Sequence, residues 1–193
     1  MLKTITLVLA GALLAPAQAP AVPKNFLLYE KQARQDEDHW ILGLDGAEDV
    51  WNIQCRPVML SGWKASREVS YDTEFGGGAR TDRRRGEQLF VFHSAKGAGK
   101  MMDRMRALLR QCGKTVKVKR PRIGDEALQA ARTIRATKKN PFPRTQKFVA
   151  VRKGPAVALY WDLHNDAKPL RTLARHRADA RKMAARMARH WSR

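Results

Sequence analysis

Apolar side chains between Ser94 and Gly113 recur at steps of three and four residues, the period of an α-helix with one buried face. Ser94 can accept a hydrogen bond from the first free N–H groups, and Gly113 can adopt the left-handed conformation that ends helices. The core-facing members are Ala98, Met101, Met102, Met105, Leu108, Leu109 and Cys112. The pattern predicts a helix over 94–113. Arg104, Arg106 and Arg110 are expected at its margin or in solvent.

Short apolar or alternating runs on both sides of this helix predict strands. The predicted strands are 63–75, 88–93, 114–119, 148–152 and 156–160, and two shorter apolar pieces lie at 40–44 and 50–53. The strand 114–119 is expected to turn Val116 and Val118 inward and Lys117 and Lys119 outward. Lys153-Gly154 predicts a hairpin between the last two strands. Antiparallel pairing follows, because hairpins and one long helix connect the strands.

Three further segments complete the expected organisation. The apolar residues 26–29 are expected to pack the N-terminus onto the core. Residues 76–85 are expected to form a flexible basic loop, and residues 123–128 a turn that leads into a loop ending at Arg144. A C-terminal amphipathic helix is predicted from Leu170, Leu173, Ala174, Ala178, Met183, Met187 and Trp191. The fold class is therefore α+β: a mostly antiparallel sheet of about five or six strands with a central and a C-terminal helix.

The N-terminus has the pattern of a secretory signal peptide. Lys3 precedes a ten-residue apolar run over 5–14, and small residues with A-x-A spacing follow. Cleavage is expected after Ala17 or Ala21, because a proline follows Ala19. The run is shorter than the roughly 20 apolar residues of a spanning helix. We expect residues 1–21 to be the signal peptide and 22–193 one secreted, extracellular domain; the alternative is an uncleaved membrane tether.

The chain has two cysteines, Cys55 and Cys112. Disulfides persist in oxidising compartments, so an exported chain with this pair is expected to form one structural disulfide. Two free buried thiols and an intermolecular bridge are the alternatives. Two cysteines without suitably spaced histidines do not indicate zinc, and we expect no metal.

Positive charge dominates the composition: 38 lysines and arginines face 18 acidic residues, giving a net charge of +20. The charges cluster at 80–85, at 114–122 and at 168–193. Such surfaces attract wall polymers, phospholipid head groups or nucleic acid. Nucleic acid is not expected, because its recognition motifs are missing. Lys117, Lys119 and Arg120 are the candidate anion-binding stripe; alternatively, the charge only solvates the surface.

The sequence gives no constellation for catalysis. Gly97-Ala98-Gly99-Lys100 lacks the first glycine and the Ser or Thr of a phosphate loop, and it falls within the predicted helix. The five histidines are scattered, and the adjacent acids Asp125 and Glu126 point apart on either a helix or a strand. We therefore expect no catalytic residues, no cofactor and no enzyme activity, although residues distant in sequence can meet in a fold.

The order of these segments resembles a known family. QLFVFHSA, RALLRQCG, KTVKVKR, IGDEAL, FVAVRKGPAVALYWD and DARKMAARM follow one another, and FLL and the segment from Trp51 to Pro57 also fit. Over about residues 23–192 the chain is similar to the PknH-like extracellular sensor domains of actinobacteria. The resemblance implies an antiparallel sheet with helices beside it, a cleft for an unidentified ligand and no agreed catalytic residues. It also implies that Asp125-Glu126 marks a helix start. We expect a stand-alone secreted member without a kinase domain.

Two functions follow as hypotheses. The first is a secreted, non-catalytic, sensor-type domain that binds a small ligand in an apolar cleft with few convergent polar groups. The second is a cationic cell-surface protein that binds anionic wall or membrane polymers, with an affinity that falls steeply with salt. An unrecognised secreted enzyme is the remaining possibility.

Overall fold

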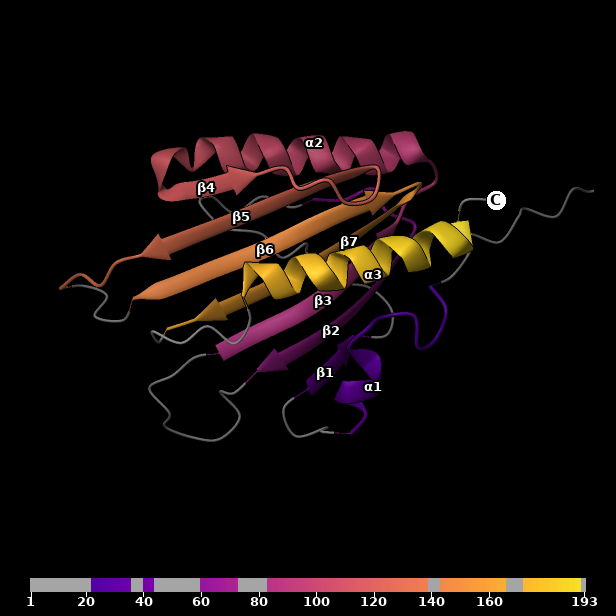
Figure 1. The fold of residues 1–193 in the computed structure, drawn as a ribbon, viewed down its shortest axis with the longest axis horizontal. Helices are drawn as coiled ribbons and strands as arrows, with labels where there is room; N and C mark the ends of the chain where they lie inside the picture. Colours follow the sequence, from indigo (N-terminus) through magenta and orange to yellow (C-terminus); the bar gives the residue numbers. More distant parts are fainter. Residues whose placement is uncertain are drawn as a thin grey trace, which may run out of the picture.

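A seven-stranded antiparallel sheet with one long helix on each face forms the centre of the protein (Figure 1). The computed structural model describes residues 22–35, 40–43, 60–72, 83–138, 143–165 and 172–191. The α+β class, the antiparallel sheet and the two helices are confirmed, with seven strands instead of the expected five or six. The predicted signal peptide and the apolar piece at 50–53 lie outside the described residues.

The sheet order is β1-β2-β3-β7-β6-β5-β4, so strands that are distant in sequence pair at its centre. The strands are β1 (Trp40–Gly43), β2 (Ala65–Asp72), β3 (Arg83–Val91), β4 (Val116–Lys119), β5 (Glu126–Ile134), β6 (Arg144–Lys153) and β7 (Ala156–His164). The helices are α1 (Glu30–Ala33), α2 (Ala95–Gln111) and α3 (Leu173–Trp191), with a 3-10 turn η2 (Gly113–Thr115). β6 and β7 form the hairpin predicted around Lys153-Gly154.

α2 has the ends and the buried face that the sequence predicts. The Ser94 side chain accepts a hydrogen bond from the Gly97 N–H at 3.1 Å, and Gly113 has a positive φ of 60°. The buried residues of the helix are Ala98, Met101, Met102, Met105 and Leu109. They pack on Phe90, Leu128, Phe148 and Leu159 of the sheet. Apolar burial of this kind is the main stabilising contribution in a domain of this size.

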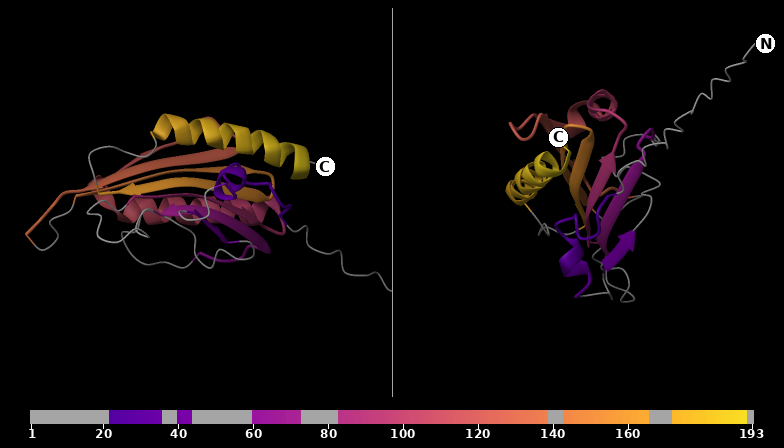
Figure 2. Two further views of the ribbon diagram at one scale, coloured as in Figure 1. Left: turned by 90° about the horizontal axis from the view of Figure 1, so that it is seen from below. Right: turned by 90° about the vertical axis from the view of Figure 1, so that its right-hand side faces the viewer.

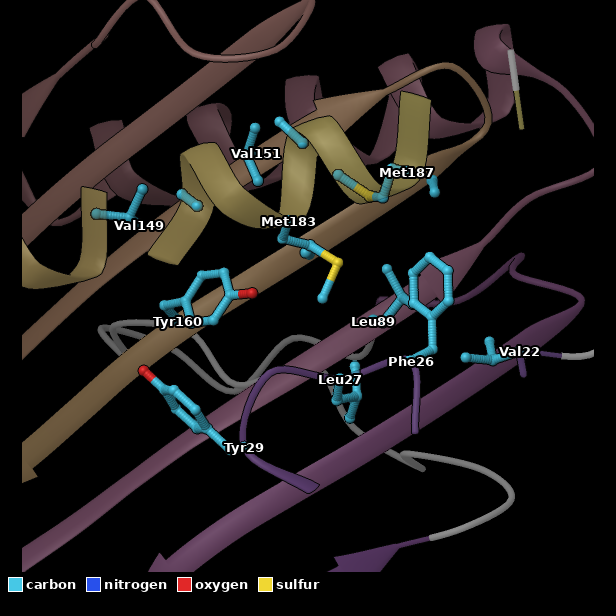
Figure 3. Packing of buried hydrophobic residues seen from close by; sticks show 14 of the residues in the cluster. Val22, Phe26, Leu27, Tyr29, Leu89, Val149, Val151, Tyr160, Met183 and Met187 are labelled. Atoms are coloured by element: carbon cyan, nitrogen blue, oxygen red, sulfur yellow. The ribbon is translucent and has the colours of Figure 1, made fainter. Parts of the chain in front are cut away.

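α3 and the N-terminal segment together close the opposite face of the sheet (Figures 2 and 3). Phe26 and Leu27 are buried, so the prediction that this segment packs onto the core is confirmed. Met183 and Met187 of α3 lie in the same cluster (Figure 3). The N-terminal segment is thus part of the hydrophobic core.

The prediction of a turn and a long loop over 123–144 was wrong, because residues 126–134 form strand β5. Its first half is buried on both faces, with Ala127 under α3 and Leu128 under α2. A strand covered on both sides loses the apolar–polar alternation that identifies half-buried strands. Asp125-Glu126 therefore precedes and begins a strand instead of a helix.

Three smaller predictions also differ from the structure. Arg83–Arg85 belong to β3 instead of a flexible loop, since β7 pairs with them. Val118 is 39% exposed, because β4 is an edge strand and only Val116 reaches the core under α2. Ala174 of α3 is exposed, and His176 and Asp179 face inward in the same helix.

Candidate anion-binding site

A hollow of about 430 Å³ lies between α2 and the connection from β4 to β5. Its lining consists of Arg106 from α2 and the continuous stretch 120–127. We call it the basic hollow. Its size falls in the range of small-ligand pockets, about 300–1,000 Å³.

Backbone constraints hold the β4–β5 connection against β6. Pro121 cannot donate a ladder hydrogen bond, so the strand ends before it. Gly124 has a φ of 64°, and a Cβ at this position would lie 2.4 Å from the Arg152 carbonyl oxygen. Only glycine fits here, because the conformation and the close approach both exclude a side chain. The next N–H, of Asp125, donates to the same carbonyl at 2.9 Å, which fixes the rim of the hollow.

The two carboxylates of the hollow are neutralised by neighbouring cations. Asp125 accepts hydrogen bonds from Lys153 Nζ at 2.7 Å, from the Gly154 N–H at 2.8 Å and from Arg152 at 3.2 Å. Partial burial alone would raise the pKa of Asp125, but these hydrogen bonds and the charges of Lys153 and Arg152 hold it below its ordinary value. Glu126 forms ion pairs with Arg106 and Arg152.

Arg120 and Arg122 then remain as uncompensated charges at the hollow. Both are exposed, and neither makes an ion pair within the described part of the chain. The buried Ile123 between them anchors the connection in the core under α3. Guanidinium groups form paired, charge-assisted hydrogen bonds with carboxylate or phosphate. The arrangement is suited to binding an anion.

The structure separates the three residues that the sequence grouped as a stripe. Lys117, Lys119 and Arg120 are all exposed. Only Arg120 lines the basic hollow, where it lies with Arg122 and Arg106. Lys117 and Lys119 instead lie on the sheet face that carries α3, since their cross-strand partners are Ala131 and Gln129 and Gln129 accepts a hydrogen bond from Arg177 of α3. In the sequence, the signal for Arg122 is the run Arg120-Pro121-Arg122, which stands just before Ile123 and Gly124. That Arg106 lies at the same hollow could be seen only in the tertiary structure.

A second, smaller hollow of about 250 Å³ lies at the first turns of α2. Leu60, Phe92 and Met101 supply apolar surface, and Lys100 and Arg104 supply positive charge. Gly97 and Lys100 lie within α2, in agreement with the conclusion that residues 97–100 are not a phosphate loop.

A buried polar network that was not predicted from the sequence connects the sheet to α3. Glu87 of β3 accepts hydrogen bonds from the Tyr160 hydroxyl at 2.5 Å and from the Tyr29 N–H at 2.9 Å. The Tyr29 hydroxyl donates to Asp179 of α3 at 2.8 Å. Glu87 and Tyr160 are fully buried, and Figure 3 shows both tyrosine rings in the cluster beneath α3. No short motif marks these residues, because they come from four separate segments.

Burial changes the protonation of this network. The pKa of Glu87 is raised to about 7. Desolvation is the largest cause and the charge of Asp179 acts in the same direction, whereas the hydrogen bonds from Tyr160 and from the N–H groups of Leu28 and Tyr29 lower it. Burial and the neighbouring Glu87 also raise the pKa of Tyr160 well above its ordinary value. These groups line neither hollow, so they hold the fold together instead of facing a ligand.

The predicted disulfide involves one described residue. Cys112 is buried at the end of α2 and is disulfide-bonded. Cys55 lies outside the described residues, so its pairing with Cys112 stays a prediction.

The described ranges contain neither a metal-binding cluster nor a membrane-spanning helix. No group of three or more histidine, cysteine or acidic side chains there is arranged to hold a metal. Among those same residues, no helix has the length and apolar character needed to cross a membrane. Comparison with family models, with curated proteins and with solved structures found no match for this chain.

Proposed function

We propose that this protein is an exported, non-catalytic ligand-binding domain of the sensor type, and that its ligand is a small anion held in the basic hollow. The observation that carries the proposal is the exposure of Arg120 and Arg122 beside carboxylates that other cations already neutralise. A carboxylate or phosphate ligand would remove the repulsion between these arginines and form paired hydrogen bonds with them.

Two features support binding over catalysis. The groups with the most perturbed protonation, Glu87 and Tyr160, are completely buried and line neither hollow. The acids at the basic hollow form ion pairs with Arg106, Arg152 and Lys153, so their oxygens are already engaged. Acid–base catalysis needs a group that reaches the substrate and exchanges a proton near neutral pH. The similarity to extracellular sensor domains, itself a prediction, supports the same conclusion.

The test is a thermal-shift screen of the exported protein with inorganic phosphate and a panel of di- and tricarboxylates. A ligand that binds only the folded state stabilises it by about 2.7 kcal/mol at a hundredfold excess over Kd. The double variant R120Q/R122Q should lose this stabilisation. The matched control is R175Q/R181Q, which removes the same charge from exposed positions of α3. Equal stabilisation of the two variants, or no stabilisation of the parent by any anion, would refute the proposal.

A second candidate function is binding of an extended anionic cell-envelope polymer. It is favoured by the exposure of Lys117 and Lys119 on the same side of the edge strand β4. The variant K117Q/K119Q separates the two functions. It should weaken retention on a polyanion such as teichoic acid and reduce the salt dependence of that retention, while leaving binding of a small anion in the basic hollow intact.

A further inference from the structure

Four segments meet at one end of the sheet: the N-terminal segment, the β3–α2 connection, the β6–β7 hairpin and the end of α3. The right-hand panel of Figure 2 faces this end. The β6–β7 hairpin contacts the β3–α2 connection, because the Phe92 N–H donates to the Pro155 carbonyl at 2.9 Å. The hairpin also approaches the end of α3, since a Cβ on Gly154 would lie 3.7 Å from the Trp191 carbonyl oxygen. The Phe26 ring lies 4.9 Å from the Trp191 ring, which brings in the N-terminal segment.

These four segments carry only positive charge. Residues 22–26, 91–100, 152–156 and 186–191 contain seven lysines and arginines and no acidic residue. Lys24, Lys96 and Arg189 are exposed, and none of them forms an ion pair with another described residue. Asp125 reaches the hairpin from the neighbouring connection, but Lys153 and Arg152 already pair with it. We call Lys24, Lys96, Arg189 and the adjoining Trp191 the basic end.

An aromatic group accompanies these charges. Trp191 is half-buried, and its ring contacts Phe26 and, at 4.7 Å, the exposed His190. Tryptophan beside lysine and arginine is typical of surfaces at a membrane–water interface, where the ring enters the head-group layer and the cations meet phosphates. A soluble polyanion would use the charges but would gain little from the ring.

The path of the chain favours the same partner. Val22, where the described structure begins, lies in the same core cluster as Phe26 (Figure 3), and the preceding sequence contains the apolar run 5–14. An uncleaved tether, the alternative to a cleaved signal peptide, would hold the basic end near the membrane.

We infer that the basic end docks on the surface of a bilayer containing anionic phospholipids. The inference is independent of the basic hollow, because it uses different residues and a different partner. Lys24, Lys96 and Arg189 supply the electrostatic attraction, and Trp191 supplies contact with the head-group layer. Each such charge near an anionic leaflet strengthens binding about fivefold, so the three together contribute about a hundredfold.

The test is co-sedimentation of the exported protein with vesicles of phosphatidylcholine and 30% phosphatidylglycerol, with pure phosphatidylcholine vesicles as the reference. We expect binding to the anionic vesicles that weakens as salt is raised. The variant K24Q/K96Q/R189Q should lower this binding about a hundredfold. The matched variant R135Q/K138Q/R144Q removes three exposed charges from the opposite end of β5 and β6 and should lower it less than threefold.

Three outcomes would overturn the inference. One is equal binding to neutral and anionic vesicles, and another is an equal loss in the two triple variants, since both indicate that the basic end has no special role. The third is that K24Q/K96Q/R189Q weakens retention on soluble polyphosphate as strongly as on vesicles, which would indicate a partner other than a bilayer. The proposed function is refuted when no anion stabilises the parent, and that result is independent of vesicle binding, so failure here and failure of the proposed function are distinguishable.

Discussion

The two faces of the sheet are closed by helices of similar length, but the helices bury different chemistry. α2 has 17 residues and α3 has 19. The buried side chains of α2 are all alanine, methionine or leucine, whereas α3 also buries His176 and Asp179. Asp179 accepts a hydrogen bond from Tyr29, and His176 Nε2 lies 3.9 Å from Asp162 of β7. The α2 interface is held by the packing of apolar side chains, whereas the α3 interface also depends on contacts between specific polar side chains.

This difference determines what each face tolerates. An apolar interface loses free energy in proportion to the volume removed, because neighbouring atoms lose their contacts. A buried polar network loses more free energy of unfolding when a single acceptor is removed, because each remaining donor is buried away from water without a hydrogen-bond partner. Substitutions at the α3 face should therefore have the larger effects on stability.

Glu87→Ala should have the largest effect, lowering the free energy of unfolding by about 3–5 kcal/mol. It removes the acceptor for the Tyr160 hydroxyl and for the N–H groups of Tyr29 and Leu28. Chemical denaturation followed by circular dichroism measures it. Glu87→Gln is the control, because its amide oxygen still accepts, and it should lose less than half as much. Similar losses in both variants would show that an accepting oxygen at this position is not what stabilises the network.

Leu109→Ala should lower the free energy of unfolding by about 3 kcal/mol. Leu109 is 3% exposed and lies on the apolar face of α2. The neighbouring Leu108 is only partly buried, so Leu108→Ala should lose clearly less in the same denaturation experiment. If the two variants were equally stable, the assigned face of α2 would be incorrect.

The stability of the α3 face should depend on pH near neutrality. The pKa of Glu87 is raised from 4.5 to about 7 in the folded state, so the folded protein holds this proton more tightly than the unfolded chain. Its contribution to stability is therefore complete below pH 4.5 and is lost as the pH rises through 7. Compared with Glu87→Gln, the parent should lose about 2–3 kcal/mol of unfolding free energy between pH 5 and pH 8. Parallel pH profiles for the two proteins would contradict this assignment.

Val118→Thr should have the smallest effect, below about 0.5 kcal/mol, because Val118 is 39% exposed on the edge strand β4. Val116→Thr, two residues away and 8% exposed, should cost about 1–2 kcal/mol. Melting temperatures of the two variants give the comparison. A larger loss at Val118 would mean that α2 covers β4 further than the structure indicates.

The features that could be predicted from the sequence lie mostly on the α2 side, and those that could not lie mostly on the α3 side. The sequence predicts α2 with both ends, the hairpin at Lys153-Gly154 and the fold class, because each depends on local periodicity or turn chemistry. It does not predict β5, whose buried first half does not alternate, and it places Ala174 instead of His176 on the inner face of α3. At the basic hollow it identifies Arg120 but groups it with Lys117 and Lys119 instead of with Arg106 and Arg122.

The sequence by itself determined the apolar face of α2, its caps and the large excess of positive charge. Each is a property of neighbouring residues, and no distant contact is needed to establish it. Only the tertiary structure decided that Glu87, Tyr160, Tyr29 and Asp179 form one buried network, and that two arginines remain uncompensated at the basic hollow. Hydrogen bonds and charge compensation depend on distances across the sheet, and the chain sets those distances only when it folds.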